Sequence, residues 1–426
     1  MKNRNLKIQI VLMVLISLLV GYFFGVNKIN YDWQHYSPQL SITSKEPPSG
    51  VIAVDFTPFW TVWQRLETNY YDKSKLDTQK MLNGAIEGMV QSVGDPFTMY
   101  LPPTQNSSFK QGLSGQFSGI GAELGLNGKQ LIVIAPLTGS PSEKAGIKAG
   151  DAIMAVDGQS TSGWDLNMAV SKIRGQKGTT VNLTVIHKGE STPKELPVTR
   201  DVITIKSVDG WIKPVSCSSV CTTIDASKAT SSSPSIAYIR LSQFGDNTNK
   251  EWSGIVSNLS SQIKSGKNIK GLILDVRNNP GGYLTDATFI ASEFLNQGAT
   301  VVSEDDGIPQ DKQTQYSTRQ GTFTNVPVVV LINRGSASAS EIVAGALRDN
   351  GRAKLVGETS FGKGTVQQAE DLGAGAGLHV TIAKWLTPNG TWVNGKGLTP
   401  DFTVLPNSKD PSEDTQLEKA IEVLVK

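Results

Sequence analysis

Residues 327–357 read PVVVLINRGSASASEIVAGALRDNGRAKLVG and predict a strand, a helix and a second strand in direct succession. An apolar run typical of a buried strand opens this stretch, and small residues then lead into a helix-like segment at 337–349. The pattern occurs once more upstream, where the buried-strand run GLILDVR at 271–277 precedes a helix-like segment at 285–295. This alternation predicts βαβ units with parallel strand pairing and therefore an α/β core.

Candidate catalytic side chains follow the ends of these predicted strands. Small residues surround Ser338 at a strand-to-helix turn, a place where a nucleophile is exposed beside the first N–H groups of a helix. The loop FGKG at 361–364 follows the next strand, and its two glycines let the backbone turn so that Lys363 points inward. Burial lowers the pKa of a lysine, and a neutral lysine can take the proton of a serine hydroxyl. Because α/β sheets place their sites at strand ends, the two loops together indicate a Ser338–Lys363 pair.

A third loop, NNPGG at 278–282, also follows a buried strand. Its glycines present bare backbone N–H groups, which suit an oxyanion hole. A tight turn before a helix is the alternative interpretation.

Histidine is the usual general base, and the chain has 3 of them. His35 lies in a polar linker and His187 in a predicted strand, while His379 alternates with its neighbours as a strand residue does. None precedes a loop suited to a Ser-His-Asp triad. A Ser-His hydrolase of small esters that uses His379 is nevertheless kept as an alternative.

Residues 333–367 resemble the active-site region of the carboxy-terminal processing (tail-specific) peptidases, which are Ser-Lys enzymes with an inserted PDZ domain. The resemblance covers nearly everything from residue 58 to the end. It implies that Ser338 is the nucleophile, that Lys363 is the general base and that Gln367 orients the lysine.

The same resemblance implies further site residues. Backbone N–H groups of Gly281, Gly282 and Ala339 would form the oxyanion hole. An aspartate after the helix is sometimes linked to activity in the family, and Asp349 matches it, although a solvated residue at a helix end is the alternative.

Residues 115–200 differ in character from the core, with short β-rich runs, Gly-rich turns and one helical stretch at 166–173. This module resembles a PDZ domain, and FSGIGAEL at 117–124 matches the loop that binds a chain-terminal carboxylate. The N–H groups assigned to that task are those of Gly119, Ile120 and Gly121. Arg174 matches a position implicated in coupling the PDZ domain to the protease core, with a plain surface arginine as the alternative.

The N-terminus carries an uncharged apolar run at 8–26, long enough to span a membrane as a helix. Lys2, Arg4 and Lys7 precede it, so we expect a single-pass protein of a bacterial-type inner (cytoplasmic) membrane with its catalytic part on the extracytoplasmic side. A cleaved signal peptide is the competing interpretation.

The predicted organisation therefore has five parts. They are a membrane anchor and linker at 1–52, an N-terminal helical region at 53–112, a PDZ domain at 113–202, a Ser-Lys peptidase core at 203–406 and a C-terminal helix at 407–426. The fold class expected is an α/β (mixed α+β) protease core of βαβ units, with an inserted PDZ domain, an N-terminal helical segment and a single N-terminal transmembrane helix.

Composition limits the partners. The net charge of +2 gives no reason to expect nucleic-acid binding, and the sequence has no metal or nucleotide motif, so no cofactor is expected. Cys217 and Cys221 are either a local loop clip or two free thiols, within a connection at 209–235 that looks longer than the family's.

The function predicted is a membrane-anchored serine endopeptidase that takes protein or peptide substrates by their free C-terminal tails and hydrolyses them through an acyl-enzyme. A catalytically inactive PDZ adaptor at the membrane is the alternative. The helical segments 58–93 and 414–426 favour a homodimer, unless they pack on their own core.

Overall fold

The computed structural model describes residues 13, 15–18, 29–34, 37–42, 54–137, 139–217, 220–230, 232–265, 268–308, 312–407, 410 and 413–426. The chain divides into two compact units, Met1–Met81 and Leu82–Lys426. The smaller unit contains the antiparallel pair β1 (Ile29–Gln34) and β2 (Ser37–Ile42), the helix α2 (Thr57–Asn69) and a short 3₁₀ turn at Lys73–Lys75. Helix α3 (Thr78–Gln91) begins in it and continues into the larger unit.

Most of the apolar run at 8–26 lies outside the described residues. Among the residues that are described, no helix is both long enough and apolar enough to cross a membrane.

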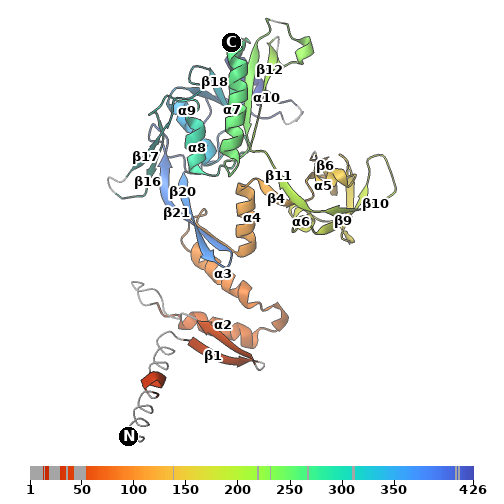
Figure 1. Ribbon diagram of the computed structural model, residues 1–426, viewed down its shortest axis with the longest axis vertical. Helices are drawn as coiled ribbons and strands as arrows, with labels where there is room; N and C mark the ends of the chain where they lie inside the picture. The colour runs from red at the N-terminus through yellow and green to blue at the C-terminus, as the bar shows by residue number, and fades with distance from the viewer. Residues whose placement is uncertain are drawn as a thin grey trace, which may run out of the picture. The chain divides into compact units, whose positions relative to one another are not determined.

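The larger unit is built on a mixed sheet in the order β13-β12-β14-β15-β18-β19-β22. Figure 1 labels two of these strands, β12 and β18. The strands of the sheet are β12 (Val208–Cys217), β13 (Cys221–Thr223), β14 (Ser235–Leu241), β15 (Ile269–Asp275), β18 (Val328–Ile332), β19 (Ala353–Gly357) and β22 (Phe402–Thr403). The five strands from β14 to β22 run parallel, and β12 pairs antiparallel with β14. The βαβ core predicted from the sequence is therefore present.

Helices cover both faces of this sheet. They are α7 (Thr248–Lys264), α8 (Leu284–Ala291), α9 (Ala339–Asp349) and α10 (Thr415–Val425). Alternate residues of the central strands belong to different cores: Leu272 and Leu274 pack with α7, α8 and α9, whereas Ile273 packs with α10. This alternation explains why β15 reads as one continuous apolar run, since both of its faces are buried.

A second sheet has the order β17-β16-β21-β20, with β3 pairing to β21. Its strands are β3 (Met99–Leu101), β16 (Thr300–Asp305), β17 (Gln313–Tyr316), β20 (Thr365–Gly373) and β21 (Ala376–Leu386), and β3 leads into α4 (Pro103–Leu113). The hairpin of β20 and β21 carries Gln367 and His379. It matters for function because it begins directly after the predicted lysine loop.

The β-rich module has a separate apolar core built on the strand order β10-β9-β7-β6-β5, with β8 paired to β7. Its elements are β5 (Ala122–Asn127), β6 (Gln130–Pro136), α5 (Pro141–Lys144), β7 (Ala152–Val156), β8 (Gln159–Ser160), α6 (Leu166–Ile173), β9 (Thr180–Ile186) and β10 (Lys194–Thr199). The chain enters through β4 (Gln116–Gly119) and leaves through β11 (Asp201–Thr204), which pair antiparallel. Entry and exit thus lie side by side, as an inserted domain requires.

Cys217 and Cys221 form a disulfide at the tip of the β12–β13 hairpin, so the clip, and not the pair of free thiols, is present.

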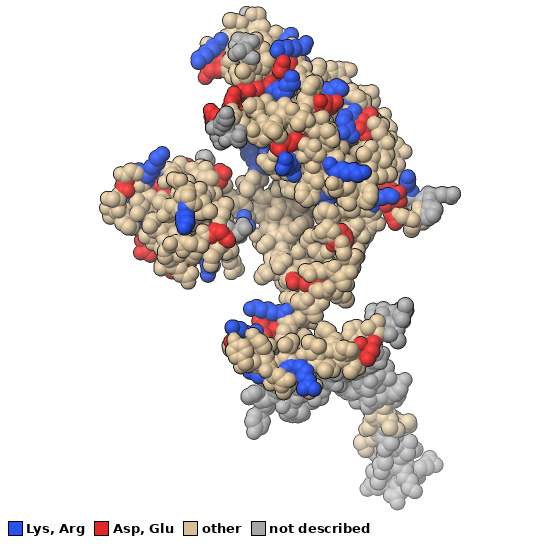
Figure 2. Space-filling model, turned by 180° about the vertical axis from the view of Figure 1, so that it is seen from behind, with Lys and Arg blue, Asp and Glu red and all other residues tan. Residues whose placement is uncertain are grey.

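Figure 2 shows Lys and Arg side chains interspersed with Asp and Glu side chains on the visible face of the larger unit.

Candidate active site

Ser338 lies at the turn between β18 and α9, immediately before the helix. Its φ of 55° and ψ of −117° place a non-glycine residue in a sparsely populated region, which costs on the order of 1–3 kcal/mol. Two neighbouring hydroxyls hold the turn against the preceding loop: Ser336 donates to the carbonyl of Val276 at 2.8 Å and Ser340 to that of Asn279 at 2.9 Å. The strained backbone is therefore supported on both sides of the serine.

Glu341, in the first turn of α9, ties the serine turn to the lysine loop. Its side chain is fully buried, and its Oε2 accepts the backbone N–H groups of Ser338 and Lys363, each at 2.9 Å. Its Oε1 accepts the N–H of Gly362 at 2.7 Å and the hydroxyl of Ser360 at 2.5 Å. Sequence reasoning missed this residue, although Ser338-x-x-Glu341 has the spacing of a capping box.

The lysine loop has little freedom. Gly362 has a φ of 88°, and a Cβ there would lie 2.7 Å from the backbone nitrogen of Gly397, so only glycine fits. The carbonyl of Lys363 accepts the indole N–H of Trp385 at 2.9 Å. With its own N–H held by Glu341, Lys363 is fixed on both sides of its Cα.

Ser338, Lys363 and Gln367 line one cavity of about 330 Å³, together with Gly281 and Gly282. The rest of the lining is largely apolar, and it includes Phe97, Met99, Phe109, Leu113, Ile342, Val366, Ala369, His379 and Trp385. Residues that are far apart in the sequence are thus brought to one apolar, concave site.

The electrostatics of the cavity favour a neutral lysine. Burial lowers the pKa of Lys363, and the negative charge of Asp95 opposes that shift. Nζ of Lys363 lies 5.1 Å from the ring centroid of Phe97. Burial also lowers the pKa of His379, with a smaller contribution from the charge of Lys363. The ring of His379 stands edge-on to that of Phe109, with 4.5 Å between the two ring centroids.

Gln367 points its amide at hydroxyls of the hairpin. Its Nε2 donates to Oγ1 of Thr365 at 2.7 Å and to Oγ1 of Thr381 at 3.1 Å. Both bonds therefore go to threonines rather than to Lys363.

The predicted oxyanion loop packs on the nucleophile. A Cβ on Gly281 would lie 2.8 Å from the Cβ of Ser338 and 3.0 Å from the nitrogen of Ala339. The N–H of Gly281 donates to Oδ1 of Asn279 at 2.9 Å. Among the hydrogen bonds of the described residues, none uses the N–H of Gly282 or that of Ala339. These two donors are thus free for a substrate oxygen, whereas Gly281 is engaged.

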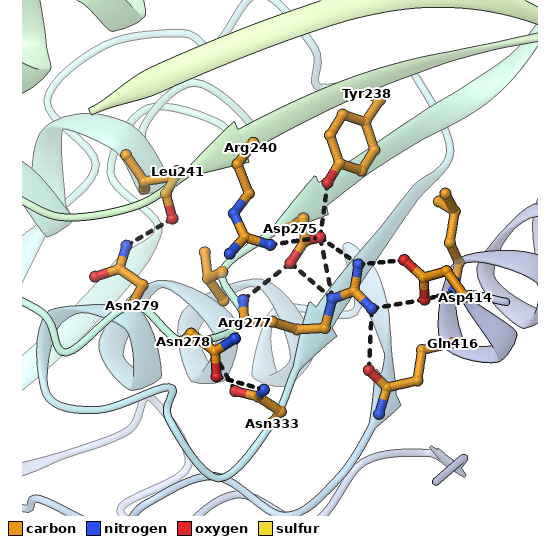
Figure 3. A network of polar contacts seen from close by, with 12 residues as sticks. Tyr238, Arg240, Leu241, Asp275, Arg277, Asn278, Asn279, Asn333, Asp414 and Gln416 are labelled. Carbon is orange, nitrogen blue, oxygen red and sulfur yellow. Dashed lines mark hydrogen bonds and ion pairs between the residues drawn. The ribbon is translucent and has the colours of Figure 1, made fainter. Parts of the chain in front are cut away.

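An ion cluster centred on the buried carboxylate of Asp275 lies at the base of this loop (Figure 3). Asp275, at the end of β15, accepts from the Tyr238 hydroxyl at 2.7 Å, from Arg240 at 3.0 Å and from Arg277 at 2.6 Å. Arg277 also forms a two-bond pair with Asp414, at 2.7 and 2.8 Å. Burial lowers the pKa of Arg277, but its hydrogen bonds with Asp414 and Asp275 raise the pKa by more. The pKa of Arg277 therefore lies above its ordinary value. The cluster therefore joins the strand before the oxyanion loop to the start of α10.

The remaining predicted residues lie away from the cavity. Arg174 follows α6, and its guanidinium lies 4.9 Å from the ring centroid of Phe117 in the β-rich module. Asp349 accepts from Nε of Arg348 at 3.0 Å and from the N–H of Asn389 at 3.1 Å, which is a structural role at the helix end.

Two backbone carbonyls of the loop predicted to bind a carboxylate accept hydrogen bonds from Ser142. Ile120 O accepts the N–H of Ser142 at 2.8 Å, and Gly121 O accepts the hydroxyl of the same serine at 2.7 Å. Gly121 has a φ of 71°, and a Cβ there would lie 2.6 Å from that of Ser140. The third residue of the loop, Gly119, ends β4 opposite Asp201.

The chain matches three protein families. Residues 235–404 match peptidase family S41, residues 108–186 match the PDZ domain, and residues 19–104 match the N-terminal domain of the activating protease CtpB. The chain belongs to the carboxy-terminal processing proteases of family S41, and it is a serine peptidase with a PDZ domain.

Two relatives come from Bacillus subtilis (strain 168). Its carboxy-terminal processing protease CtpB is 36% identical over 90% of this chain and 74% of that protein. Its carboxy-terminal processing protease CtpA is 35% identical over 79% of this chain and 66% of that protein. Since these relatives are named as proteases, a catalytically inactive PDZ adaptor is not favoured.

Two solved structures share the fold. A photosystem II D1 C-terminal processing protease is 30% identical, with a TM-score of 0.50 over 88% of this chain and 98% of that one. A putative S41 protease from Bacteroides fragilis NCTC 9343 is 14% identical, with a TM-score of 0.55 over 89% and 98%, which is a likeness of fold alone.

Proposed function

We propose that this peptidase cleaves by an acyl-enzyme mechanism in which Ser338 is the nucleophile and Lys363 is the general base. The observation that carries the proposal is the carboxylate of Glu341, which holds the backbone N–H groups of both residues at one cavity. The buried, apolar surroundings of Lys363 lower its pKa and so favour the neutral amine that a base requires.

The chemistry follows from these positions. Oγ of Ser338 attacks the scissile carbonyl carbon while the amine of Lys363 takes the hydroxyl proton. The resulting ammonium returns that proton to the departing amine, which leaves an acyl ester on Ser338. Water then adds to the ester carbon while Lys363 takes a proton from it. Lys363 returns this proton to Oγ of Ser338 as the ester C–O bond breaks, so the carboxylic acid product leaves and the serine is regenerated.

Backbone donors stabilise the tetrahedral oxyanion in both steps. The N–H groups of Gly282 and Ala339 carry no other bond among the described residues and serve directly. Gly281 joins them once its N–H leaves Oδ1 of Asn279. Loss of one such donor costs on the order of 100-fold or more in rate.

Gln367 orients Lys363 in this proposal. Its amide is anchored through Thr365 and Thr381 on the β20–β21 hairpin, so its oxygen is the group available to the lysine. The role is one of positioning, because the amide exchanges no proton with the substrate.

We propose further that substrates are proteins or peptides gripped by their free C-terminal tails at Gly119, Ile120 and Gly121, and that Arg174 couples this grip to the core. The PDZ match supports the tail preference. Amidation of a substrate's terminal carboxylate should then weaken its cleavage severalfold, through KM, while an internal amide change should not.

Membrane anchoring through residues 8–26, an extracytoplasmic catalytic part at a bacterial-type inner membrane, and a homodimer are also proposed. The apolar run and the basic residues before it support the first two. The exposed apolar side chains of α2, such as Trp60 and Val62, support the third. Sedimentation of the full chain with membranes tests the anchoring. Digestion by a protease added outside the membrane tests the extracytoplasmic location, and light scattering in detergent tests the homodimer.

The dyad is tested by cleavage of an unfolded protein with the full chain in detergent. Wild type and the exposed-lysine control Lys396→Ala should cleave, and Ser338→Ala and Lys363→Ala should not. A folded Lys363→Ala variant that cleaves at the wild-type rate would exclude Lys363 as the base. Loss of cleavage in His379→Ala alone would instead favour the Ser-His alternative.

A further inference from the structure

The turn between α3 and β3 forms one wall of the active-site cavity. Gly94-Asp95-Pro96 lies in this turn, shortly after α3 ends at Gln91. In the structure, Phe97 and Met99 line the same cavity as Ser338 and Lys363. A segment from the N-terminal helical region therefore completes a site whose chemistry lies in the core.

Asp95 is the centre of the hydrogen bonding in this turn. Its Oδ1 accepts the N–H of Phe97 at 3.1 Å, and its Oδ2 accepts the hydroxyl of Thr98 at 2.7 Å. Burial raises the pKa of Asp95, but the hydroxyls of Thr381 and Thr98 more than offset this and lower it. The side chain is therefore a fixed carboxylate, not a neutral acid.

Hydrogen bonds continue from this carboxylate to Gln367. The hydroxyl oxygen of Thr98 accepts the N–H of Thr381 at 3.1 Å. Oγ1 of Thr381 in turn accepts Nε2 of Gln367 at 3.1 Å. Three segments distant in sequence, namely the α3–β3 turn, β21 and β20, are thus joined in one polar chain that ends at the proposed lysine-orienting residue.

The same carboxylate acts on the lysine through space. Its negative charge raises the pKa of Lys363, against the larger effect of burial. Phe97, whose N–H is bound to Asp95, also lies under the Lys363 ammonium. Glu341 of α9 holds the backbone of the lysine, and His379 of β21 is a titratable group whose own pKa the lysine lowers. Tyr283 is a further titratable group in the lining of the same cavity.

We propose that Asp95 is a positioning residue of the catalytic centre, which holds Lys363 over Phe97 and Gln367 against Thr381. The proposal rests on the Ser338–Lys363 mechanism above. If Asp95 has this role, the geometry of the catalytic centre depends on the position of α3, because Asp95 follows that helix by a few residues. Displacement of α3 would remove a charge from the lysine and an anchor from the glutamine together.

The pH profile of kcat/KM separates this role from a merely structural one. The acidic limb of the profile reports deprotonation of Lys363 in the free enzyme. In Asp95→Asn of the full chain, which keeps the shape of the side chain but not its charge, this limb should move to lower pH. The direction follows because the lost carboxylate had favoured the ammonium form.

Two further variants complete the test. Asp371→Asn removes a carboxylate that is 65% exposed at the far end of the same hairpin, and it should leave the limb in place. Thr381→Val keeps every charge but removes the hydroxyl that accepts from Gln367 and that lowers the pKa of Asp95. It should leave the limb in place and lower kcat on the plateau by on the order of 100-fold, the loss that a misplacement of about 1 Å can cause.

Each outcome is decisive. A reduced plateau with an unmoved limb in Asp95→Asn would overturn the electrostatic role, and an unchanged kcat in folded Thr381→Val would overturn the link to Gln367. If Asp95→Asn does not fold, Thr381→Val still tests the chain of hydrogen bonds. Cleavage by Lys363→Ala would mean that the dyad itself is wrong, whereas an inactive Lys363→Ala with an unmoved limb in Asp95→Asn would reject only the role of Asp95.

Discussion

The backbone nitrogen of Lys363 lies 2.9 Å from Oε2 of Glu341, and the same oxygen accepts the N–H of Ser338 at 2.9 Å. One buried carboxylate oxygen therefore sets the position of the proposed base relative to the proposed nucleophile. With Gly362 and Ser360 on the other oxygen, the carboxylate of Glu341 accepts hydrogen bonds from four donors.

Glu341→Gln should therefore impair activity far more than its small size change suggests. The amide presents an NH₂ group to donors that need an acceptor, so at least one buried N–H loses its partner, at about 1–3 kcal/mol each. We expect kcat to fall on the order of 100-fold, with a lower unfolding midpoint in urea. Glu370→Gln, at an exposed position on β20, is the matched control and should change neither. Full activity in folded Glu341→Gln would show that this carboxylate does not set the geometry.

Asp286→Asn should stabilise the protein at pH 8 but not at pH 4. Burial raises the pKa of Asp286 to about 6, Asn249 partly opposes this, and the charge of Asp246 adds to it. Its Oδ1 accepts from Asn249 at 2.7 Å, while Oδ2 and the Asn249 oxygen have no donor within the described part of the chain. An asparagine amide would supply one of the missing donors without a buried charge.

The pH dependence follows from the sign of that shift. An aspartate in the unfolded chain ionises near pH 3.9. Between about pH 4 and pH 6 the native state therefore binds more protons than the unfolded state, so wild-type stability falls as the pH rises through that range. The gain from Asp286→Asn should be on the order of 1–2 kcal/mol at pH 8 and absent at pH 4. Urea unfolding at both values measures it, and an equal gain at pH 4 would reject ionisation as its cause.

Arg277→Met should destabilise the core by about 3–5 kcal/mol, because the buried carboxylate of Asp275 loses its strongest partner. Asp275→Asn in the same chain should restore part of the loss, since it removes a buried charge that only Arg240 and the Tyr238 hydroxyl would still contact. Arg334→Met breaks an ion pair with Glu358 whose arginine is 84% exposed, and it should cost about 1 kcal/mol or less. Similar losses for the two arginine variants would contradict the argument from burial.

The sequence was sufficient where local patterns determine structure. The buried runs of β15 and β18, the small-residue turn before α9 and the Gly-Lys-Gly loop are all local, so the pairing of Ser338 with Lys363 at one cavity followed from strand ends. Glu341 and Asp95 could not be assigned in this way, because their roles depend on which loops meet across the sheets. The engagement of the Gly281 N–H with Asn279 also depends on a rotamer that no sequence pattern specifies.

The rate at which a fluorophosphonate modifies Ser338, followed by intact mass, tests the central claim most directly. In the full chain at pH 8 we expect one adduct on Ser338 in wild type, in Lys396→Ala and in His379→Ala. Lys363→Ala should react on the order of 100-fold or more slowly, the usual contribution of a general base. Modification of folded Lys363→Ala at the wild-type rate would contradict the assignment of Lys363 as the base that activates Ser338.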